Sequence, residues 1–574
     1  MYTLGINAAF HDASACLVHD GKVVAAAQED RFTRRSHARG PAPCPGRLPF
    51  HAVDACLAAA DITLAQVDQV AYAYNPYAIL RELRRQGFVT VPLRGALPVD
   101  VATGSPWDPL FLCAVVRASE SLVHEAPRHL RARLQGPPPR PGTWHYIPHH
   151  LAHAAAAFLP SPFRSAAVMT LGGCGERITT FYALGNATRL HPLGWVGAPH
   201  SLVALYQDVT AHLGFAPAAD EDCVLALGAH GRPVFLDFFR QHIRLLGDGR
   251  YATAPFHPSA RLGPARSRGG PLEQRHCDIA RSLQLAVEDV VAHLARWLHD
   301  VTEEKHLCLA GELALNSALV ARLREERLFQ EIWVQPAAGD AGTALGAALW
   351  MDAVKRCAAT RAFQMDHAFL GPAFSDEELA DALRWSGAPF RRVDDVAEAT
   401  AALLAEERVV AFFQGRMELG PHGLGARSVL ASPRRAEMRA RVDQLKERDD
   451  LRPLDAAVLA EEAPRWFAGA RTAPFLTARH DVMPDKARLI PAVRHVDGTA
   501  RVHTVHAQQH GALHGVLQAF LQRTHVPVLV NTTFRVRGEP MVCTPRDALQ
   551  AFWTSPLDAL VLGPFLVEKP WLHG

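Results

Sequence analysis

Short apolar runs separated by polar turns predict strands near the start of the chain. TLGIN (3–7), ASACLVHDG (13–21) and KVVAAAQED (22–30) are short and mainly apolar, and Asp20–Gly21 is typical of a hairpin turn. Three more strands are expected in RSAAVMTL, HLCLAG and EIWVQP, and helices at roughly 281–300, 317–326 and 341–354. Strands that alternate with helices indicate a layered α/β architecture.

A change of pattern near residues 357–374 predicts a second domain. A helix ends there, and FLGPAFSDEELADAL begins a new unit with its own helix-capping residues. RVVAFFQG, VPVLVNTTF and DALVLGPFLV read as buried strands, and Thr544, Pro545 and Asp547 together predict a capped helix start. We therefore expect one domain over 1–356 and a smaller one over 357–574.

Composition narrows the class of protein. Apolar residues make up 49% and charged residues 21% of the 574 positions, with a formal net charge of +2, so nothing favours binding to nucleic acid or to an anionic membrane. The ten cysteines include no CxxC pair, which argues against a zinc ribbon or a disulfide framework. No signal-peptide pattern and no apolar run of about 18 residues is found, so we expect a cytoplasmic protein that does not span a membrane.

A pair of histidines raises the question of a metal site. In IPHHLAHAAAAFL the alanine-rich run predicts a buried helix, and His149 and His153 lie four residues apart, on one face of it. Two hydrogen-bonded structural histidines are one interpretation. The other is a metal site, because histidines at this spacing can direct two ring nitrogens at one ion.

Other polar residues follow predicted strands in both domains. In the first domain, NAAFHDASA supplies His11 and Asp12. The segment TLGGCGERITT is glycine-rich and is either a tight turn or a loop that binds a phosphate through its backbone N–H groups. Asp340 is either a helix N-cap or a ligand. In the second, basic residues in polar loops are either solvated or able to hold phosphate groups: Arg416, Arg427, Lys446, Arg448 and Arg452. The strand VPVLVNTTF ends in Asn531, Thr532 and Thr533, which suit an anion or a small amide.

Taken together and in order, these segments resemble the O-carbamoyltransferase family of antibiotic and nodulation-factor biosynthesis. The resemblance runs along nearly the whole chain and is strongest in HDASACLVHDGKVVAAAQEDRFTR, HHLAHAA, DAGTALGAA, GRMELGPHGLGARS, HVDGTARVHTV and NTTFRVRGEP. It implies an α/β fold: an actin-like, sugar-kinase-like duplicated N-terminal domain, followed by a smaller twisted α/β domain that forms carbamoyl adenylate from carbamoyl phosphate and ATP. The first domain then passes the carbamoyl group to a hydroxyl of a natural-product acceptor. A homodimer is expected by the same analogy.

The resemblance also implies roles for individual residues. His11, beside Asp12, matches the general base that takes the proton from the acceptor alcohol. The metal, Fe²⁺ in family members with Zn²⁺ as the alternative, would be held by His149, His153 and Asp340. The residues that the resemblance implies for binding carbamoyl phosphate and ATP are Arg427, Lys446, Arg448, Arg452, Arg501, Asn531, Thr532 and Thr533. The nucleotide-binding positions of the first domain are Gly173, Gly175, Gly311 and Asn316.

The sequence departs from the family at several of these positions. Gly172–Gly173 stands where the family has an Asp-Gly pair, and Cys223 replaces a lysine. Ala226 and Glu312 replace glycines, and His422 replaces an arginine. A carboxylate at 312 is expected to repel a phosphate. Two alternatives to an ATP-dependent carbamoyltransferase therefore remain: a nucleotide-independent reaction in the same pocket (acyl transfer, cyclisation or elimination), and a non-catalytic scaffold that partners an intact relative.

Overall fold

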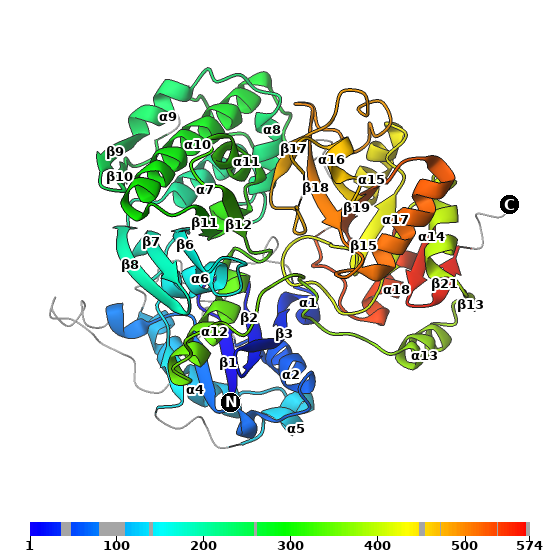
Figure 1. Ribbon diagram of the computed structural model, residues 1–574, viewed down its shortest axis with the longest axis horizontal. Helices are drawn as coiled ribbons and strands as arrows, with labels where there is room; N and C mark the ends of the chain where they lie inside the picture. The colour runs from blue at the N-terminus through cyan, green and yellow to red at the C-terminus, as the bar shows by residue number, and fades with distance from the viewer. Residues whose placement is uncertain are drawn as a thin grey trace. The chain divides into compact units, whose positions relative to one another are not determined.

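The chain folds into two compact units, which are residues 1–365 and 366–574. In this computed structural model the described residues are 1–35, 48–79, 109–136, 142–257, 261–446, 454–470, 472–536 and 538–569 (Figure 1). The first unit ends nine residues after the expected boundary (365 against 356). The reason is local: Arg361 Nη1 donates to the carbonyl of Phe158 at 2.8 Å, and the Met365 N–H donates to the carbonyl of Pro160 at 2.8 Å.

The first half of unit 1 is a five-stranded sheet in the order β3-β2-β1-β4-β5. Its strands are β1 (Tyr2–Asn7), β2 (Ser14–His19), β3 (Lys22–Gln28), β4 (Gln69–Tyr72) and β5 (Trp144–Tyr146). β1 to β3 are antiparallel, while β4 and β5 run parallel to β1. The hairpin turn predicted between β2 and β3 is confirmed, with Asp20 and Gly21 both at positive φ (49° and 83°).

The second half of unit 1 repeats this topology. Its sheet has the order β12-β11-β6-β7-β8, in which β6, β7 and β8 are antiparallel, and β11 and β12 run parallel to β6. The strands are β6 (Ser165–Leu171), β7 (Ile178–Asn186), β8 (Arg189–Gly197), β11 (His306–Ala310) and β12 (Glu331–Val334). Two halves with one strand order confirm the duplicated α/β architecture that the resemblance implied.

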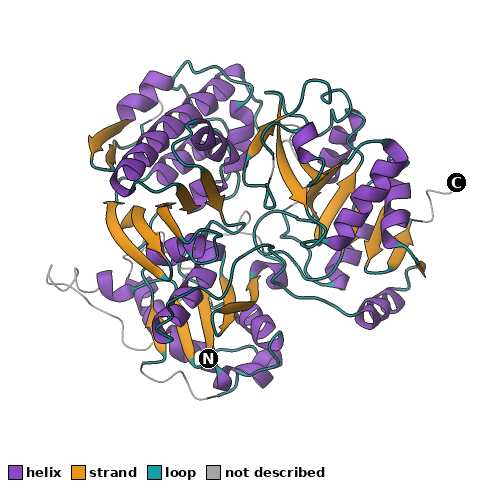
Figure 2. Ribbon diagram, in the orientation of Figure 1, coloured by secondary structure: helices purple, strands orange, loops and turns teal. Residues whose placement is uncertain are grey.

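Helices cover both sheets of unit 1 (Figure 2). Those that matter most for the candidate site are α6 (His149–Phe158), α11 (Ser317–Glu325), α12 (Thr343–Lys355) and α10 (Gln274–Thr302). The remaining α-helices and strands of the described part of this unit are α1 (Asp30–Thr33), α2 (Phe50–Ala58), α4 (Pro109–His124), α5 (Arg131–Leu134), α7 (Leu202–His212), α8 (Glu221–Gly228), α9 (Leu236–His242), β9 (Ile243–Gly247) and β10 (Arg250–Thr253). The three predicted helices are confirmed, although the first begins at Gln274, earlier than expected, because its amphipathic pattern extends in that direction.

Glycines without a side chain let α12 approach its neighbours closely. A Cβ on Gly346 would lie 1.9 Å from the carbonyl oxygen of Ala152 in α6, and one on Gly5 would lie 1.9 Å from the carbonyl oxygen of Ala344. Both distances are far below van der Waals contact, so larger residues at 5 or 346 would separate these elements. The small residues of HHLAHAA and DAGTALGAA therefore fix how α6 and α12 pack.

Unit 2 is built on one mixed nine-stranded sheet in the order β13-β21-β20-β14-β15-β19-β16-β18-β17. The strands are β13 (Phe390–Arg392), β14 (Val410–Phe413), β15 (Arg427–Ala431), β16 (Asp455–Leu459), β17 (Arg479–Asp481), β18 (Thr499–Val505), β19 (Val528–Thr533), β20 (Ala559–Leu562) and β21 (Phe565–Glu568). The helices are α13 (Asp376–Ser386), α14 (Val396–Ala405), α15 (Glu437–Lys446), α16 (Ala463–Trp466), α17 (Gly511–Thr524) and α18 (Pro545–Trp553).

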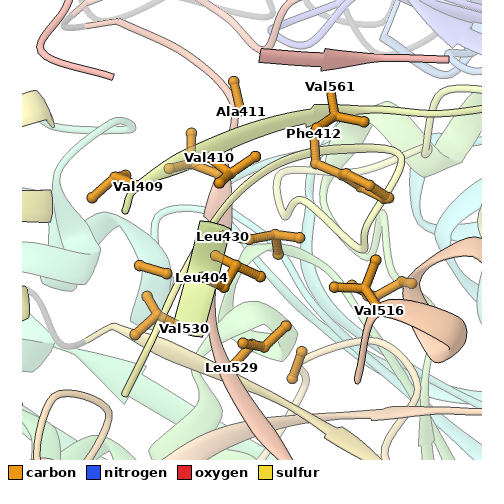
Figure 3. Packing of buried hydrophobic residues seen from close by; sticks show 14 of the residues in the cluster. Leu404, Val409, Val410, Ala411, Phe412, Leu430, Val516, Leu529, Val530 and Val561 are labelled. Atoms are coloured by element: carbon orange, nitrogen blue, oxygen red, sulfur yellow. The ribbon is translucent and has the colours of Figure 1, made fainter. Parts of the chain in front are cut away.

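The core of unit 2 joins the central strands to α14 and α17. Val410, Leu430, Val530 and Val561 from four strands belong to one buried cluster with Leu404 of α14, in which Leu430 lies next to Leu404 and Val561 next to Phe412 (Figure 3). The capping box predicted at the start of α18 is confirmed, since the Thr544 side chain accepts from the Asp547 N–H and Asp547 returns the contact. Across the described residues, no helix is both long and apolar enough to cross a membrane.

Candidate functional site

The two histidines of α6 converge with one carboxylate in the interior of unit 1. His149 Nε2 and His153 Nε2 are 3.1 Å apart, and they lie 3.3 and 3.2 Å from Asp340 Oδ1. All three side chains are buried, with at most 2% of their surface exposed. The helix predicted from the alanine-rich run places the pair on one face, so the imidazoles meet rather than diverge.

Hydrogen bonds around His149 fix its orientation. His149 Nδ1 is 3.1 Å from the carbonyl oxygen of Ala73, to which it donates, so Nε2 is the ring nitrogen that faces His153 and Asp340. The main-chain N–H groups of His149 and Asn75 both donate to the buried Glu176 carboxylate, at 3.0 and 2.6 Å. This carboxylate stands at the N-terminus of α6, where the helix dipole favours negative charge. Burial alone would lower the pKa of His149, but the Asp340 carboxylate outweighs it and raises the pKa to about 9.

Asp340 does not act as a helix cap. It opens a short 3₁₀ turn, Asp340–Gly342, and no side-chain cap bond is found there or at the start of α12. Its backbone carbonyl accepts from Thr343 Oγ1 at 2.7 Å, and Ser14 Oγ donates to the carbonyl of Ala341 at 2.8 Å, which ties this turn to β2. The Asp340 carboxylate thus points at the histidines, while its Oδ2 atom is buried without a hydrogen-bond donor.

His11 and Asp12 lie in the loop between β1 and β2. Asn7 at the end of β1 donates from Nδ2 to the carbonyls of His11 and Asp12, at 3.0 and 3.1 Å, and so holds the loop. His11 Nδ1 is 3.0 Å from Asp12 Oδ2, and His11 Nε2 is 3.2 Å from Glu312 Oε1 and 3.7 Å from Asp340 Oδ2. Burial would lower the pKa of His11, but the carboxylates of Asp340, Asp12 and Glu312 hold it well above its usual value.

Glu312 is brought to this cluster by the backbone that precedes it. Gly311 follows β11 with φ at +88°, and a Cβ there would lie 2.2 Å from the carbonyl oxygen of Leu171, so only glycine fits. Glu312 then starts a 3₁₀ turn (Glu312–Leu315). Its Oε1 atom faces His11, and its Oε2 atom is buried without a hydrogen-bond donor.

The glycine-rich loop packs on His150, which the sequence did not single out. A Cβ on Gly172 would lie 3.0 Å from His150 Cε1, and one on Gly175 would lie 3.0 Å from His150 Cδ2. The same Gly172 Cβ would be 3.3 Å from Glu312 Oε2. The His150 ring is held by a 2.6 Å contact with Thr170 Oγ1, and burial lowers its pKa well below the usual value. The space beside Gly172 is therefore filled by His150 and the Glu312 carboxylate.

The remaining N-terminal candidates have structural partners. Asn316 caps α11, accepting from the Leu319 N–H at 3.0 Å, and its Nδ2 donates to Gln284 Oε1 at 2.9 Å. The Gly175 N–H donates to the carbonyl of Ile178 at 2.7 Å, which closes the loop that also contains Gly173. Cys223 and Ala226, the two departures in the segment EDCVLALG, both lie in α8.

In unit 2, the side chain of Arg427 holds together the loop of residues 414–427. Its side chain is fully buried, and Nη1 donates to the carbonyls of Gln414, Gly415 and Ala426 at 3.0, 3.2 and 3.1 Å. The guanidinium lies 3.5 Å above the centre of the Phe413 ring, and burial lowers the pKa of Arg427 to about 10. In this structure Arg427 bonds to main-chain oxygens, as does Arg416, which donates to the carbonyls of residues 370 and 371.

Buried Glu418 has a similar role on the same loop. Its Oε1 atom accepts from the main-chain N–H groups of Leu424, Ala426 and Arg427, at 2.7, 3.1 and 3.1 Å. A carboxylate that accepts three backbone N–H groups resembles the way such loops hold anions. The amides of residues 424, 426 and 427 therefore already have an anionic partner within the chain.

The other polar candidates of unit 2 surround the turn that contains His422 and Gly423. Asn531 Nδ2 donates to the Gly423 carbonyl at 2.9 Å, and Thr533 Oγ1 accepts from the Gly423 N–H at 3.1 Å. Arg501 forms a two-contact ion pair with Asp455, at 2.5 and 3.1 Å, and its Nη1 atom is 3.5 Å from His422 Nε2.

Four other residues predicted for this site are Thr532, Lys446, Arg448 and Arg452. Thr532 is 5% exposed on β19. Lys446 ends α15, so its main chain is placed there. Arg448 and Arg452 lie outside the described residues. The structure thus brings Arg501, Asn531 and Thr533 to one turn together with His422.

The donor set in unit 1 fits a divalent metal. Ligands bonded at about 2.1 Å are separated by about 3.0 Å at right angles and about 3.4 Å in a tetrahedron. The nitrogen and oxygen atoms of His149, His153 and Asp340 are separated by 3.1 to 3.3 Å, within this range. Two imidazoles and a carboxylate are the donor types that suit iron and zinc.

Comparison with known proteins establishes the family. Residues 2–136 and 140–349 match the carbamoyltransferase N-terminus, and residues 401–569 match the carbamoyltransferase C-terminus. An uncharacterized protein of Synechocystis is 34% identical over 99% of this chain and 97% of its own length. The nodulation protein NolNO of Sinorhizobium fredii is 34% identical over 98% of this chain and 80% of its own. Among solved structures, a ROK hexokinase from Thermus thermophilus is 13% identical, with a TM-score of 0.31, over 62% of this chain and 100% of the hexokinase.

These matches and the geometry together define the class: a two-unit carbamoyltransferase-like enzyme with a histidine–carboxylate cluster in its first unit. The chain belongs to the carbamoyltransferase family.

Proposed function

We propose that this protein is an ATP-dependent O-carbamoyltransferase that acts on a hydroxyl group of a small natural product. Unit 2 forms carbamoyl adenylate from carbamoyl phosphate and ATP, in a step in which water takes the phosphoryl group of carbamoyl phosphate as phosphate and ATP loses pyrophosphate, and unit 1 transfers the carbamoyl group. The convergence of His149, His153 and Asp340 beside His11 is the observation that carries the proposal. It is supported by the match of both units to one carbamoyltransferase family.

In unit 1 the transfer is a substitution at the carbamoyl carbon. With His11 in its neutral form, the acceptor hydroxyl gives its proton to Nε2, and the Asp12 carboxylate accepts from Nδ1–H and so fixes the ring. The acceptor oxygen forms a bond to the carbamoyl carbon, and the bond from that carbon to the phosphate oxygen breaks, so that AMP leaves with the electron pair. A divalent ion, Fe²⁺ or Zn²⁺, bound by His149, His153 and Asp340 would offset the negative charge of the adenylate phosphate.

In unit 2 the residues separate into two roles. Arg427 and Glu418 hold the loop of residues 414–427 by main-chain bonds, and so keep Gly423 where Asn531 and Thr533 contact it. The cations that offset the charge of carbamoyl phosphate and ATP are then Lys446, Arg448, Arg452 and Arg501. Of these, Arg501 is already oriented by Asp455.

Release of pyrophosphate tests the first half of the proposal. The full chain, incubated with ATP and carbamoyl phosphate, is expected to release pyrophosphate, and Lys446→Ala is expected to abolish the release. Lys486→Ala, a lysine of the same unit that pairs with Asp485, is the matched control and should keep it. Undiminished release from Lys446→Ala would show that the anion site is assigned wrongly.

One observation favours a second candidate, a nucleotide-independent acyl transfer, cyclisation or elimination in the same pocket. The Glu312 carboxylate stands beside the glycine-rich loop, where it disfavours a phosphate. This reaction predicts that no pyrophosphate is released and that a pathway intermediate, but not ATP, raises the thermal midpoint.

Cytoplasmic location and a homodimer remain predictions, and light scattering of the purified chain checks the dimer.

A further inference from the structure

Two histidines from separate segments of unit 1 direct their ring nitrogens at each other, apart from the site described above. His51 lies in the first turn of α2, and His129 lies in the 3₁₀ turn Arg128–Leu130. Their Nε2 atoms are 3.3 Å apart, although 78 positions separate the two residues in the sequence. The ring centroids are 5.4 Å apart and the planes are inclined by 40°, so the rings meet through their nitrogen atoms and do not stack.

The other ring nitrogen of His51 is held by a carboxylate. His51 Nδ1 is 2.6 Å from Glu29 Oε1, and Glu29 Oε2 accepts from the main-chain N–H of Ala52 at 2.8 Å. Because a carboxylate accepts, Glu29 keeps the hydrogen of the neutral His51 ring on Nδ1 and leaves the lone pair on Nε2. A histidine that donates from one nitrogen to a carboxylate is the usual arrangement of a metal ligand.

From these contacts we propose that His51 and His129 bind one divalent transition-metal ion such as Zn²⁺ through their Nε2 atoms, with water as the remaining ligands. Glu29 orients the first of the two rings. The ion fastens the segment of residues 109–136 to α2. This site shares no residue with the interior cluster on α6, and it does not depend on the proposed function.

The separation of the two nitrogen atoms suits such an ion. Zinc–nitrogen bonds are about 2.0–2.1 Å long, so nitrogen atoms 3.3 Å apart subtend an angle of about 105–110° at the ion, which is close to tetrahedral. The side chain of His51 is 29% exposed and His129 is exposed, so water can reach the other ligand positions. A hydrogen bond between two neutral rings would give a similar separation, and metal binding distinguishes the two arrangements.

The segment that carries His129 has a second contact with α2. Arg133 in α5 donates from Nη1 to both carboxylate oxygens of Asp54, at 3.2 Å each. The Arg133 side chain is 47% exposed, and an exposed ion pair contributes little to stability. An ion shared by two ring nitrogens therefore supplies a link between these segments that the ion pair alone does not.

Zinc stoichiometry tests the proposal. The full chain is stripped with a chelator and dialysed against Zn²⁺, and bound zinc is counted by elemental analysis. The unchanged chain is expected to bind one more equivalent than His51→Gln or His129→Gln. The double variant should lose no more zinc than either single variant, because the two rings share one ion. Glu29→Gln should keep the equivalent but bind it at least about 10-fold more weakly.

Two controls identify the equivalent that is lost. His191→Gln changes an exposed histidine of β8 and should bind as much zinc as the unchanged chain. His149→Ala disrupts the interior cluster and should leave the other equivalent in place, so that adding His129→Gln removes one more. Because His129 is exposed, His129→Gln should fold even if His51→Gln does not.

Three results would contradict the proposal. Equal zinc binding by the unchanged chain and His129→Gln, or no zinc on either, would show that the two rings share only a hydrogen bond. A further loss in the double variant would show that the rings do not share one ion. Unchanged affinity in Glu29→Gln would overturn the role given to that carboxylate.

Discussion

A single methyl group between α6 and α12 should disturb the candidate metal site from a distance. α6 carries His149 and His153, while Asp340 lies in the turn that leads into α12, so the contact between the two helices sets the ligand distances. Gly346 forms that contact. In Gly346→Ala the added Cβ would lie 1.9 Å from the carbonyl oxygen of Ala152, whereas an ordinary contact needs about 3.4 Å.

The size of the effect follows from that overlap. Relieving it requires a shift of about 1.5 Å (3.4 less 1.9) between the helices. Metal–ligand distances tolerate only about 0.2 Å, so a displaced Asp340 would no longer complete the set with His149 and His153. We expect at least about 10-fold weaker metal binding and about 1–3 kcal/mol of lost stability from overpacking.

Dialysis against Co²⁺ and thermal unfolding of the stripped chain measure the two effects separately. Gly511→Ala is the matched control, because the space around Gly511 at the start of α17 is open and the added methyl meets nothing within 4 Å. Its metal binding and thermal midpoint should not fall. If Gly346→Ala binds metal as tightly as the unchanged chain, helix spacing does not set the ligand geometry, and the reasoning is refuted.

Three further results are expected. Burial, together with His510 and His506, lowers the pKa of His503 from 6.5 to about 3. Below pH 6.5 the unfolded chain therefore takes up a proton at this residue that the folded chain does not, and the free energy of unfolding falls by about 1.4 kcal/mol per pH unit as the pH drops. The substitution His503→Asn should reduce the loss in thermal midpoint between pH 7 and 5. Arg427→Met orphans several main-chain carbonyls and should cost about 3 kcal/mol or more, seen by denaturant unfolding of the full chain; a loss below about 1 kcal/mol would contradict the assigned role. Glu176→Gln weakens the anchor at the start of α6 and should cost about 1 kcal/mol, with several-fold weaker Co²⁺ binding in the same dialysis.

Features that depend on local sequence were predictable. The hairpin at Asp20–Gly21, the capping box at Thr544 and the face shared by His149 and His153 each depend on residues at most four positions apart. Periodicity and turn chemistry are sufficient for such features. The duplicated halves of unit 1 were implied by the resemblance, and their common strand order confirms them.

Features that depend on long-range packing were not predictable. An N-cap was the favoured local interpretation of Asp340, because a carboxylate between a strand and a helix is usually a cap; His153, 187 positions away, makes it a candidate ligand instead. Arg427 read as a phosphate ligand, but its partners are carbonyls of a loop that folds back over it. Glu176 gave no signal, since its partners are two main-chain N–H groups at 75 and 149.

The duplication itself explains why the cluster forms where it does. His11 follows β1 of the first half, while Glu312 and Asp340 follow β11 and β12 of the second, and all three lie just beyond the ends of their strands. A cation bound to His149 and His153 of α6, which follows β5 of the first half, and to Asp340 therefore joins the two halves, and it stabilises the arrangement in which they meet. At a free metal concentration 100 times the dissociation constant, this linkage amounts to about 2.7 kcal/mol. Metal binding should thus slow hydrogen exchange at α6 as well as at the turn that begins at Asp340, because the ion holds these two segments together.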